Sequence, residues 1–480
     1  MRSSKVFVAL VTVGMCSLAV CIAVWSCLGS RCSLPGWLPS KAHMLTDRTP
    51  GELIRYTLRR IDGHPFLVLL ARPPLLWVQS IYERPVSLPP SVTLGKGQQA
   101  DNLPSITGQG SETEIIARTN LEIARAFGNA QPGQVISIVP GRYTLDSKLR
   151  TAAAGLKDRP ITVRASQAGK VNIEISSQEG FYVTQPYWIF ENLQISGKCT
   201  EHRQCEHAFH VVGKAHHTVI RNNQIVDFNA HIKVNGMEGE WPDEGQIIFN
   251  TLTNTIPRET SFPVTPIDMV GANRWNIADN VVSNFIKAQG DHISYGIFMK
   301  GAGRGGRIER NLVICTTHDI SQDGERVGIS FGGGGTGAGL CRDAQCDHEY
   351  LDGVIVNNIV AHCNDFGVDV NKSKNILIAH NTIINTAGID VRNSSILIKT
   401  YGNIYDGFLL AKNNSEIKSD ITSGPKAKEI YRHPEVLTFQ CLTQIEKIPS
   451  INLANRDFRN GLRNDGTAPG AFDKCENTGG

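Results

Sequence analysis

The sequence predicts an all-β solenoid, a right-handed parallel β-helix, and three observations indicate this fold class. Asparagines that precede short β-branched or leucine-containing strands recur along most of the chain. Their spacing is about 22 to 31 residues with one gap of 47, a regular period broken by one insertion. The 46 glycines and the short Val/Ile runs favour a turn-rich β protein. The recurring asparagines are Asn192, Asn223, Asn250, Asn280, Asn311, Asn358, Asn381 and Asn403.

Each repeat contains strands that are too short to bury a face alone, so the stacking of repeats must make the core. Neighbouring coils are expected to lie about 4.8 Å apart, with equivalent positions in register. Asparagines stacked in this way can form an amide ladder that satisfies the backbone of the turns.

Alternate side chains of a β-strand face opposite sides, so an alignment of the repeated strands predicts an inner and an outer row. We align residues 208–212, 266–270, 296–300, 328–332, 367–371 and 388–392. The inner row is then apolar: Phe209/Val211, Ile267/Met269, Ile297/Met299, Ile329/Phe331, Val368/Val370 and Ile389/Val391. The outer row is His210, Asp268, Phe298 with Lys300, Ser330, Asp369 with Asn371, and Asp390 with Arg392.

This outer row combines ionisable groups, an aromatic ring and a hydroxyl group, which suits a sugar polymer. We therefore predict that substrate binds to Asp268, Phe298, Ser330, Asp369, Asn371 and Arg392. A solvated face is the alternative for each residue. Lys300 is followed by four glycines within six residues, which keep the adjacent turn low and open to a substrate. The run of glycines at 332–335 is expected to bound a cleft together with the inserted segment that follows it.

The composition is that of a folded protein: 41% of residues are hydrophobic, 19% are charged, and the net charge is +3. Because no basic stripe with interleaved aromatic residues is present, we expect no nucleic-acid partner.

The twelve cysteines divide into two groups. Four lie in or beside an N-terminal apolar run, and the other eight permit disulfides in an oxidising compartment. We predict the pairs Cys199–Cys205 and Cys341–Cys346, with Cys441–Cys475 as a further candidate. Cys315 and Cys363 occupy similar places in successive strands, where they are either bonded or free. The nearby histidines do not give a structural zinc spacing.

The N-terminal apolar run covers residues 6–28 and follows Arg2 and Lys5. It is long enough to cross a bilayer of about 30 Å as a helix. By the positive-inside rule, the N-terminus is cytoplasmic and the rest is exported. The alternative is a cleaved signal peptide, whose apolar region is usually about 7 to 15 residues long. We therefore expect a single-pass anchor in the cell inner membrane, with the body in the periplasm or otherwise outside the cytoplasm.

Three regions follow from this reading: the anchor or signal peptide at 1–28, an exported stalk or linker at 29–110, and the β-helix domain at 111–480. Within the irregular, proline-rich stalk, an apolar piece at 65–76 either lies on the membrane or packs on the body. Ile115, Ile116, Leu121, Ile123 and Ala124 recur at roughly helical spacing before Gly128, so a helix is predicted to cover the open end of the stack.

Two segments carry recognisable motifs: residues 131–143, QPGQVISIVPGRY, and Asp457-Phe-Arg-Asn-Gly-Leu with Pro469-Gly-Ala-Phe. They resemble the opening and the closing motif, respectively, of the pectin-lyase-like parallel β-helix proteins. The two segments bracket about three quarters of the chain. The resemblance implies the fold and points to alginate and chondroitin lyases and mannuronan epimerases, although the epimerase motif Asp-Pro-His-Asp is absent.

A lyase of this kind removes the proton α to a carboxylate, so it needs a base, a cation beside the developing enediolate, and a proton donor. The resemblance implies Lys300 as the base and a nearby arginine, here Arg326, as the carboxylate partner. His292 and His210 are alternative bases. The alginate and chondroitin-B lyases bind calcium at an Asn/acidic site, which Asp268, Asp369 and Glu325 match only loosely, so Ca²⁺ is a candidate cofactor.

The leading hypothesis is an exported, membrane-tethered lyase that cleaves a uronate-containing polysaccharide by β-elimination. A non-catalytic glycan-binding or assembly component of polysaccharide export is the alternative of a different class. A C5-epimerase and a glycoside hydrolase are also open. The expected partners are an acidic polysaccharide and, through the N-terminal helix, the membrane.

Overall fold

The computed structural model describes residues 113–317, 324–333, 335–419, 426–442, 445–464 and 466–474, and before them residues 54, 57, 58, 61 and 65–82. The predicted anchor at 6–28 and most of the predicted stalk lie outside this part of the chain. One piece of the stalk is a helix, α4 (Pro65–Tyr82). Among the described residues, no helix is long and apolar enough to cross a membrane.

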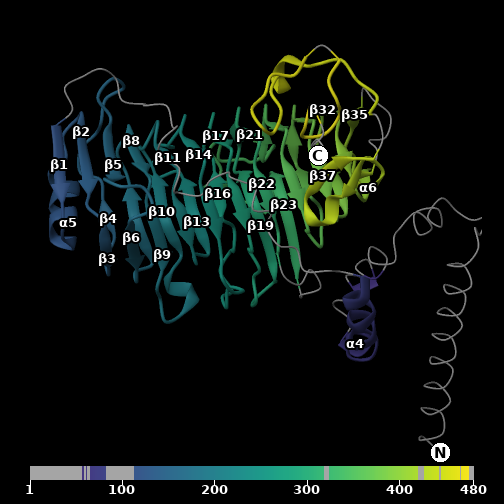
Figure 1. Ribbon diagram of the computed structural model, residues 1–480, viewed down its shortest axis with the longest axis horizontal. Helices are drawn as coiled ribbons and strands as arrows, with labels where there is room; N and C mark the ends of the chain where they lie inside the picture. Colours follow the sequence, from purple (N-terminus) through teal and green to yellow (C-terminus); the bar gives the residue numbers. More distant parts are fainter. Residues whose placement is uncertain are drawn as a thin grey trace, which may run out of the picture. The chain divides into compact units, whose positions relative to one another are not determined.

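From residue 113 onward the chain winds through three long parallel sheets, A, B and C, of 12, 10 and 10 strands (Figure 1). Each coil passes through sheet C, then sheet A, then sheet B, and each strand pairs with its counterpart in the next coil. This is the predicted parallel β-helix.

Sheet A consists of β1 (Thr113–Ala117), β2 (Gln134–Ile138), β5 (Ile161–Ala165), β8 (Trp188–Glu191), β11 (Val219–Arg221), β14 (Gln246–Ile248), β17 (Asn276–Ala278), β21 (Arg307–Glu309), β25 (Val354–Val356), β29 (Leu377–Ala379), β32 (Ile398–Tyr401) and β35 (Ile417–Ser419). Sheet B consists of β3 (Gly141–Leu145), β6 (Val171–Ile175), β9 (Gln194–Gly197), β12 (Gln224–Val226), β15 (Thr251–Thr253), β18 (Val281–Ser283), β22 (Leu312–Ile314), β26 (Ile359–Ala361), β30 (Thr382–Ile384) and β33 (Ile404–Tyr405). Sheet C consists of β4 (Leu149–Arg150), β7 (Glu179–Val183), β10 (His207–Val212), β13 (Ala230–Asn235), β16 (Ile267–Val270), β19 (Ile293–Lys300), β23 (Glu325–Phe331), β27 (Val368–Asn371), β31 (Gly388–Arg392) and β34 (Phe408–Ala411). Short strands β20 (Gly303–Arg304), β24 (Tyr350–Leu351) and β28 (Ser373–Lys374) pair at the corner between sheets C and A.

The predicted strand alignment is confirmed by the register of sheet C. Met269 pairs with Met299, and Met299 pairs with Phe331. All three side chains are buried in the core between the sheets. The alignment missed one strand: β13 lies between β10 and β16 and adds a coil that the sequence reading passed over.

The asparagine ladder is present from Asn223 to Asn403. In each step, Oδ1 of one asparagine accepts hydrogen bonds from the backbone N–H and Nδ2 of the asparagine one coil earlier, as between Asn280 and Asn311 (3.0 and 2.9 Å). Asn192 is not a member, contrary to the prediction. The backbone N–H of Leu193 takes its place and donates to Asn223, because the ladder position in that coil falls one residue later.

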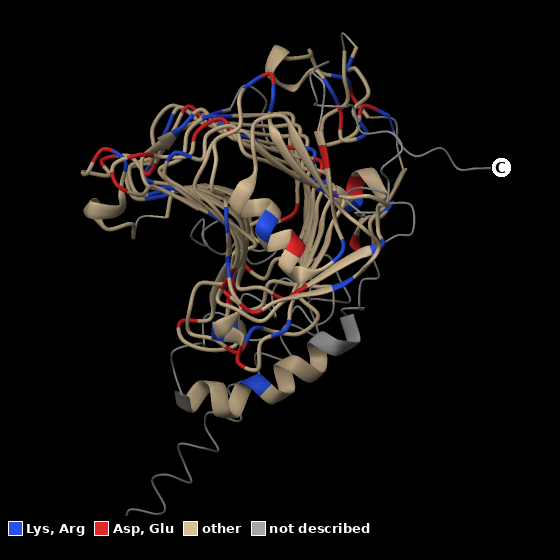
Figure 2. Cartoon of the chain, turned by 90° about the vertical axis from the view of Figure 1, so that its left-hand side faces the viewer, with Lys and Arg blue, Asp and Glu red and all other residues tan. Residues whose placement is uncertain are grey.

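The predicted capping helix is α5 (Asn120–Asn129), which begins after Thr119, whose hydroxyl accepts a hydrogen bond from the Glu122 N–H at 3.2 Å. Its Phe127 ring packs 5.4 Å from the Trp188 ring and 5.8 Å from the Phe181 ring. Figure 2 looks onto this end of the stack and shows the helix lying across the core. Ile115 and Ile116 were predicted in the helix but belong to β1, where they extend sheet A.

The C-terminal segment folds back along the side of the stack. It contains α6 (Ala427–Ile430), the hairpin β36 (Tyr431–His433) and β37 (Thr438–Cys441), and residues of the predicted closing motif. Phe458 and Phe472 pack on the outer face of sheet B, against side chains such as Leu312 and Ile359. The closing motif is therefore a lateral cover of sheet B.

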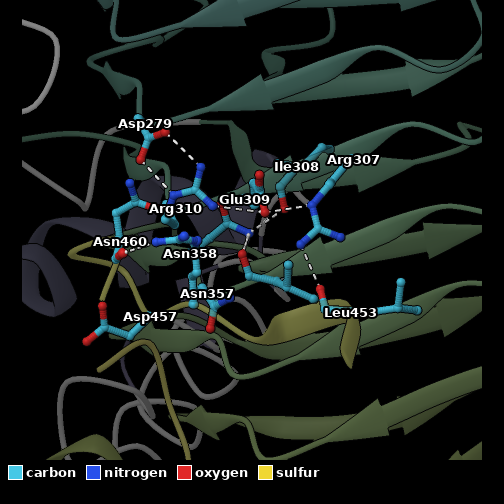
Figure 3. A network of polar contacts seen from close by, with 12 residues as sticks. Asp279, Arg307, Ile308, Glu309, Arg310, Asn357, Asn358, Leu453, Asp457 and Asn460 are labelled. Atoms are coloured by element: carbon cyan, nitrogen blue, oxygen red, sulfur yellow. Dashed lines mark hydrogen bonds and ion pairs between the residues drawn. The ribbon is translucent and has the colours of Figure 1, made fainter. Parts of the chain in front are cut away.

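Polar contacts hold this segment at the corner between sheets A and B (Figure 3). Arg310 donates to both oxygens of Asp279 at 2.8 and 2.9 Å and lies 3.0 Å from Glu309. Arg307 donates to Glu309 and to the backbone carbonyl of Leu453. The network ties two turns of the stack to the returning chain.

The predicted disulfides Cys199–Cys205 and Cys341–Cys346 are present. Cys315 and Cys363 are also bonded, which decides the alternative that the sequence left open. Cys441 is disulfide-bonded, while its predicted partner Cys475 lies outside the described residues.

Candidate active site on sheet C

The outward side chains of sheet C form one column, with one residue from each coil. The strand register places these residues in order: Tyr182, His210, Lys233, Asp268, Phe298, Ser330, Asp369, Asp390 and Leu410. Lys300, Asn371 and Arg392 lie two residues further along their strands. The structure therefore brings six predicted binding residues, and also Lys300 and His210, to one face.

Many side chains of this outward face are buried. The face is therefore not the solvent-exposed surface that the sequence left open as an alternative. Asp369 and Ser330 have no exposed surface, Asp268 is 4% exposed and Phe298 is 6% exposed. Buried carboxylates need cationic partners, and each acid in the column has one.

Asp268 lies between two lysines. Nζ of Lys233 donates to Oδ2 of Asp268 at 2.5 Å, and Nζ of Lys300 lies 4.0 Å from Oδ1. Burial alone would raise the pKa of Asp268, but the charges of Lys233 and Lys300 outweigh it and lower this pKa below its usual value. Oδ1 is buried and accepts no hydrogen bond from the described residues. The ion pair between Lys300 and Asp268 is therefore long and contains no hydrogen bond. Nζ of Lys300 also lies 4.2 Å from the centre of the Phe298 ring.

His210 is held from both sides. Its Nδ1 contacts the Glu179 carboxylate, and its Nε2 lies 2.7 Å from Oδ1 of Asn235. The Asn235 amide is itself oriented by its bond to the Gly236 carbonyl at 2.9 Å. The hydrogen bond to His210, helped by Lys148, lowers the pKa of Glu179 to about 2. Both ring nitrogens of His210 are therefore occupied by protein contacts, which hold the ring in place on this face.

The C-terminal half of the column is a separate set of ion pairs. Arg392 donates to both oxygens of Asp369 at 3.0 and 2.9 Å, and Lys412 donates to Asp390 at 3.0 Å. Burial raises the pKa of Asp369 to about 6 against the opposing effect of Arg392. Ser330 donates to the Gly332 carbonyl at 2.8 Å.

The inserted segment after β23 forms a wall beside Lys300. Arg342 donates to both oxygens of Asp243 at 2.7 and 2.9 Å and lies over the Trp241 ring. Glu349 accepts a hydrogen bond from the N–H of Gly301, the residue after Lys300, at 3.1 Å. A Cβ at Gly333 would lie 2.4 Å from the Phe298 ring, so any larger residue there would displace the ring or the wall that crosses it.

Arg326 and His292 are not brought to this centre. Arg326 is 1% exposed and pairs with Ser294, six residues before Lys300 and so roughly 20 Å away along an extended strand. His292 precedes β19 by one residue, at the far end of the strand from Lys300. The prediction that these two residues lie near Lys300 is therefore not met by the register of sheet C.

The acids that loosely matched a calcium site do not form one. Asp268 and Asp369 are three coils apart, roughly 14 Å. Lys233 holds Asp268, and Arg392 occupies both oxygens of Asp369. Glu325 is exposed at the opposite end of β23 from Phe331. This donor set does not fit calcium.

Sequence reasoning missed Lys233, Asn235, Glu179 and Tyr182. The signal was present for the first two, because residues 230–235, AHIKVN, alternate apolar and polar side chains as the aligned strands do. Glu179 and Tyr182 belong to β7, one coil earlier than the alignment began. His207 was also missed; it is buried, and burial lowers its pKa to about 3, so its imidazole is neutral at neutral pH.

No family model and no curated protein matches this sequence. Among solved structures, the chain is similar to the pectate lyase Pel9A, at 14% identity over 75% of this chain and 96% of that chain, with a TM-score of 0.50. An alginate lyase from Paenibacillus sp. str. FPU-7 matches at 14% identity over 63% and 99% of the two chains, with a TM-score of 0.37. A rhamnogalacturonan lyase matches at 12% identity over 72% and 90%, also with a TM-score of 0.37.

The likeness to Pel9A shows the fold alone: the chain is a parallel β-helix.

Proposed function

We propose that this protein is a polysaccharide lyase that cleaves a uronate-containing polymer by β-elimination at Lys300. One observation carries the proposal. Lys300 is a partly exposed amine, 4.0 Å from the buried Asp268 carboxylate, on a face where the other cations are tightly paired. The similarity to a pectate lyase supports the same reaction class.

In this reaction the Lys300 amine, in its neutral form, takes the proton at C5 of a uronate residue. The electron pair moves into the carboxylate to give an enediolate, and positive charge nearby stabilises it. Lys233 is the fixed cation of the site, since Asp268 holds its Nζ at 2.5 Å. The C4–O4 bond then breaks, a C4=C5 double bond forms, and the leaving oxygen takes a proton from the newly charged Lys300.

The test is to incubate the full chain with several uronate polymers and follow the ultraviolet absorbance of the new C=C bond conjugated with the carboxylate. Lys300→Ala removes the amine, and Lys300→Arg replaces it with a guanidinium that stays protonated and cannot accept a proton. Both variants are therefore expected to abolish the rise. Both variants should keep the wild-type thermal midpoint, since Lys300 is partly exposed. Lys399→Ala, an exposed lysine on sheet A, is the matched control and should be fully active.

Full activity in both Lys300 variants would remove Lys300 as the base. Glycan binding with no absorbance rise and no shortening of the polymer, in the wild type, would favour the non-catalytic binding component. Product analysis separates the remaining reactions: a hydrolase shortens the polymer without a double bond, and a C5-epimerase changes the sugar without shortening it.

We also propose that the apolar run at 6–28 tethers the chain to the inner membrane with the body outside the cytoplasm. The charges of Arg2 and Lys5 before the run support this orientation. Protease added to spheroplasts should digest the body, and protection of the body would refute the orientation. A mature N-terminus after Leu28 would show a cleaved signal peptide.

A further inference from the structure

Helix α4 (Pro65–Tyr82) is apolar on almost all sides, and five of its large side chains are exposed. Arg72 is its only charged residue. The exposed fractions are 64% for Phe66, 45% for Leu67, 73% for Leu69, 48% for Leu70 and 67% for Trp77. A helix that is apolar all round is normally buried in a protein or in lipid.

Within the part of the chain that the structure describes, such a group of exposed large apolar side chains is confined to α4. Every other helix or strand that the structure describes carries at most one exposed large hydrophobic side chain, such as Leu121 on α5 or Ile116 on β1. Single exposed apolar residues are ordinary, whereas a contiguous group of them marks a contact surface.

The shape and charge of α4 select the partner. Its 18 residues include Arg72 and the prolines Pro73 and Pro74 near the middle, and it is not apolar enough to cross a membrane. The exposed Trp77 suits the boundary between headgroups and acyl chains, where tryptophan is enriched. The flanking sequence before the helix carries Arg55, Arg59 and Arg60 against Glu52 and Asp62, and this net positive charge suits anionic headgroups.

We propose that α4 lies in the headgroup layer of an anionic bilayer, with its exposed apolar side chains at the acyl boundary and Arg72 at the phosphates. The helix would be a second membrane contact, beyond the N-terminal run. The 36 residues between that run and α4 reach well over 100 Å when extended, at roughly 3.3 Å per residue, so both segments can meet one bilayer. This inference does not depend on polysaccharide cleavage.

The experiment uses the full chain reconstituted into nanodiscs whose lipids carry brominated acyl chains, which quench nearby tryptophan. The Trp77 contribution is the difference in quenching between the wild type and Trp77→Phe. In discs of phosphatidylcholine with phosphatidylglycerol, we expect a quenched component in the wild type that Trp77→Phe lacks. Equal quenching of the two proteins would overturn the proposal, whether or not the chain is tethered elsewhere.

Two further comparisons sharpen the result. Leu69→Glu should reduce the Trp77 component severalfold, whereas Leu340→Glu should leave it unchanged, because Leu340 is equally exposed (68%) but lies in the inserted segment of the β-helix. The quenching of Trp77 should fall in discs of phosphatidylcholine alone and at high salt. Unchanged quenching under these conditions would refute the proposal that α4 binds anionic headgroups. Crosslinking of α4 between two chains without lipid quenching would assign the helix to a second copy and overturn the proposal. The absorbance assay for elimination is independent of all these outcomes.

Discussion

At the residue scale, the alternation of side chains along a strand predicts which side of the sheet a residue faces. It does not predict how far that residue is buried. Phe331 faces inward and Phe298 outward, as the alignment predicts. However, Phe298 is 6% exposed because it stacks on Tyr295 at 4.2 Å and lies under the wall at Gly333. The wall comes from an insertion outside the repeat, so a period-based alignment could not show that it covers Phe298.

Phe331 and Phe298 should therefore differ in their contribution to stability. Phe331→Ala should lower the free energy of unfolding by about 3 to 5 kcal/mol, because it leaves a cavity in the core beside Tyr350. Phe298→Ala should cost about 2 kcal/mol, since it loses burial under a loop that can adjust. Denaturant unfolding of the two variants checks this. A larger loss for Phe298→Ala would mean that the wall, and not the sheet interior, dominates packing at this coil.

The Glu179–His210 pair should give an acid-dependent contribution to stability. The pKa of Glu179 is lowered to about 2 in the folded chain, mainly by the hydrogen bond from His210. A carboxyl with a depressed folded pKa stabilises above its unfolded pKa, near 4.3, and loses that contribution as the pH falls through the folded pKa. The wild type should therefore be more stable than Glu179→Gln at pH 6, with the difference shrinking between about pH 4.3 and pH 2. Thermal midpoints across this range measure it, and a constant difference would contradict the pairing.

At the element scale, the site depends on how a repeated element meets a unique one. β19 places Lys300, and the inserted segment after β23 sets the turn that follows it. The repeat in the sequence predicted the strand and the glycine-rich turn. It could not predict that Arg342 reaches back to Asp243, a contact across 99 residues, because nothing in the local pattern of either residue encodes it. Strand β13 was left out of the sequence alignment, so the alignment could not predict that Lys233 lies beside Asp268.

Removal of the Arg342 contact should impair turnover more than folding. Arg342→Ala breaks the bidentate pair with Asp243 and releases the wall over Trp241, so we expect kcat/KM to fall about 10- to 100-fold through misplacement of the groups around Lys300. The wall keeps its Cys341–Cys346 disulfide, so the thermal midpoint should change little. Arg304→Ala is the control, because its pair with Asp352 is exposed at the neighbouring corner. Equal kinetics in the two variants would mean that the wall does not shape the site.

At the scale of the whole molecule, one row of buried amides connects successive coils. Seven asparagines from Asn223 to Asn403 each join two coils, and their spacing was the strongest signal in the sequence. The one error in that row, Asn192, arose because an asparagine one residue before the ladder position has the same local sequence pattern. It lies in the left-handed region, with φ of 63°, and accepts a hydrogen bond from Asn222 instead.

The ladder should make the stack sensitive to the loss of any central member. Asn311→Ala would leave two donors of Asn280 without their acceptor, and the carbonyls of Ile277 and Glu309 without their donor. Each buried group left unsatisfied costs about 1 to 3 kcal/mol, so the variant should unfold well below the wild type and be cleaved by protease within the coils on either side. Asn172→Ala, on the half-exposed outer face of β6, is the matched control and should leave the thermal midpoint within a degree or two, because surface substitutions usually change stability by about 0.5 kcal/mol or less. Equal losses of stability in both variants, or cleavage of Asn311→Ala spread evenly along the chain, would contradict this prediction. The apolar core alone would then couple the coils, and the asparagine ladder would not contribute to their stability.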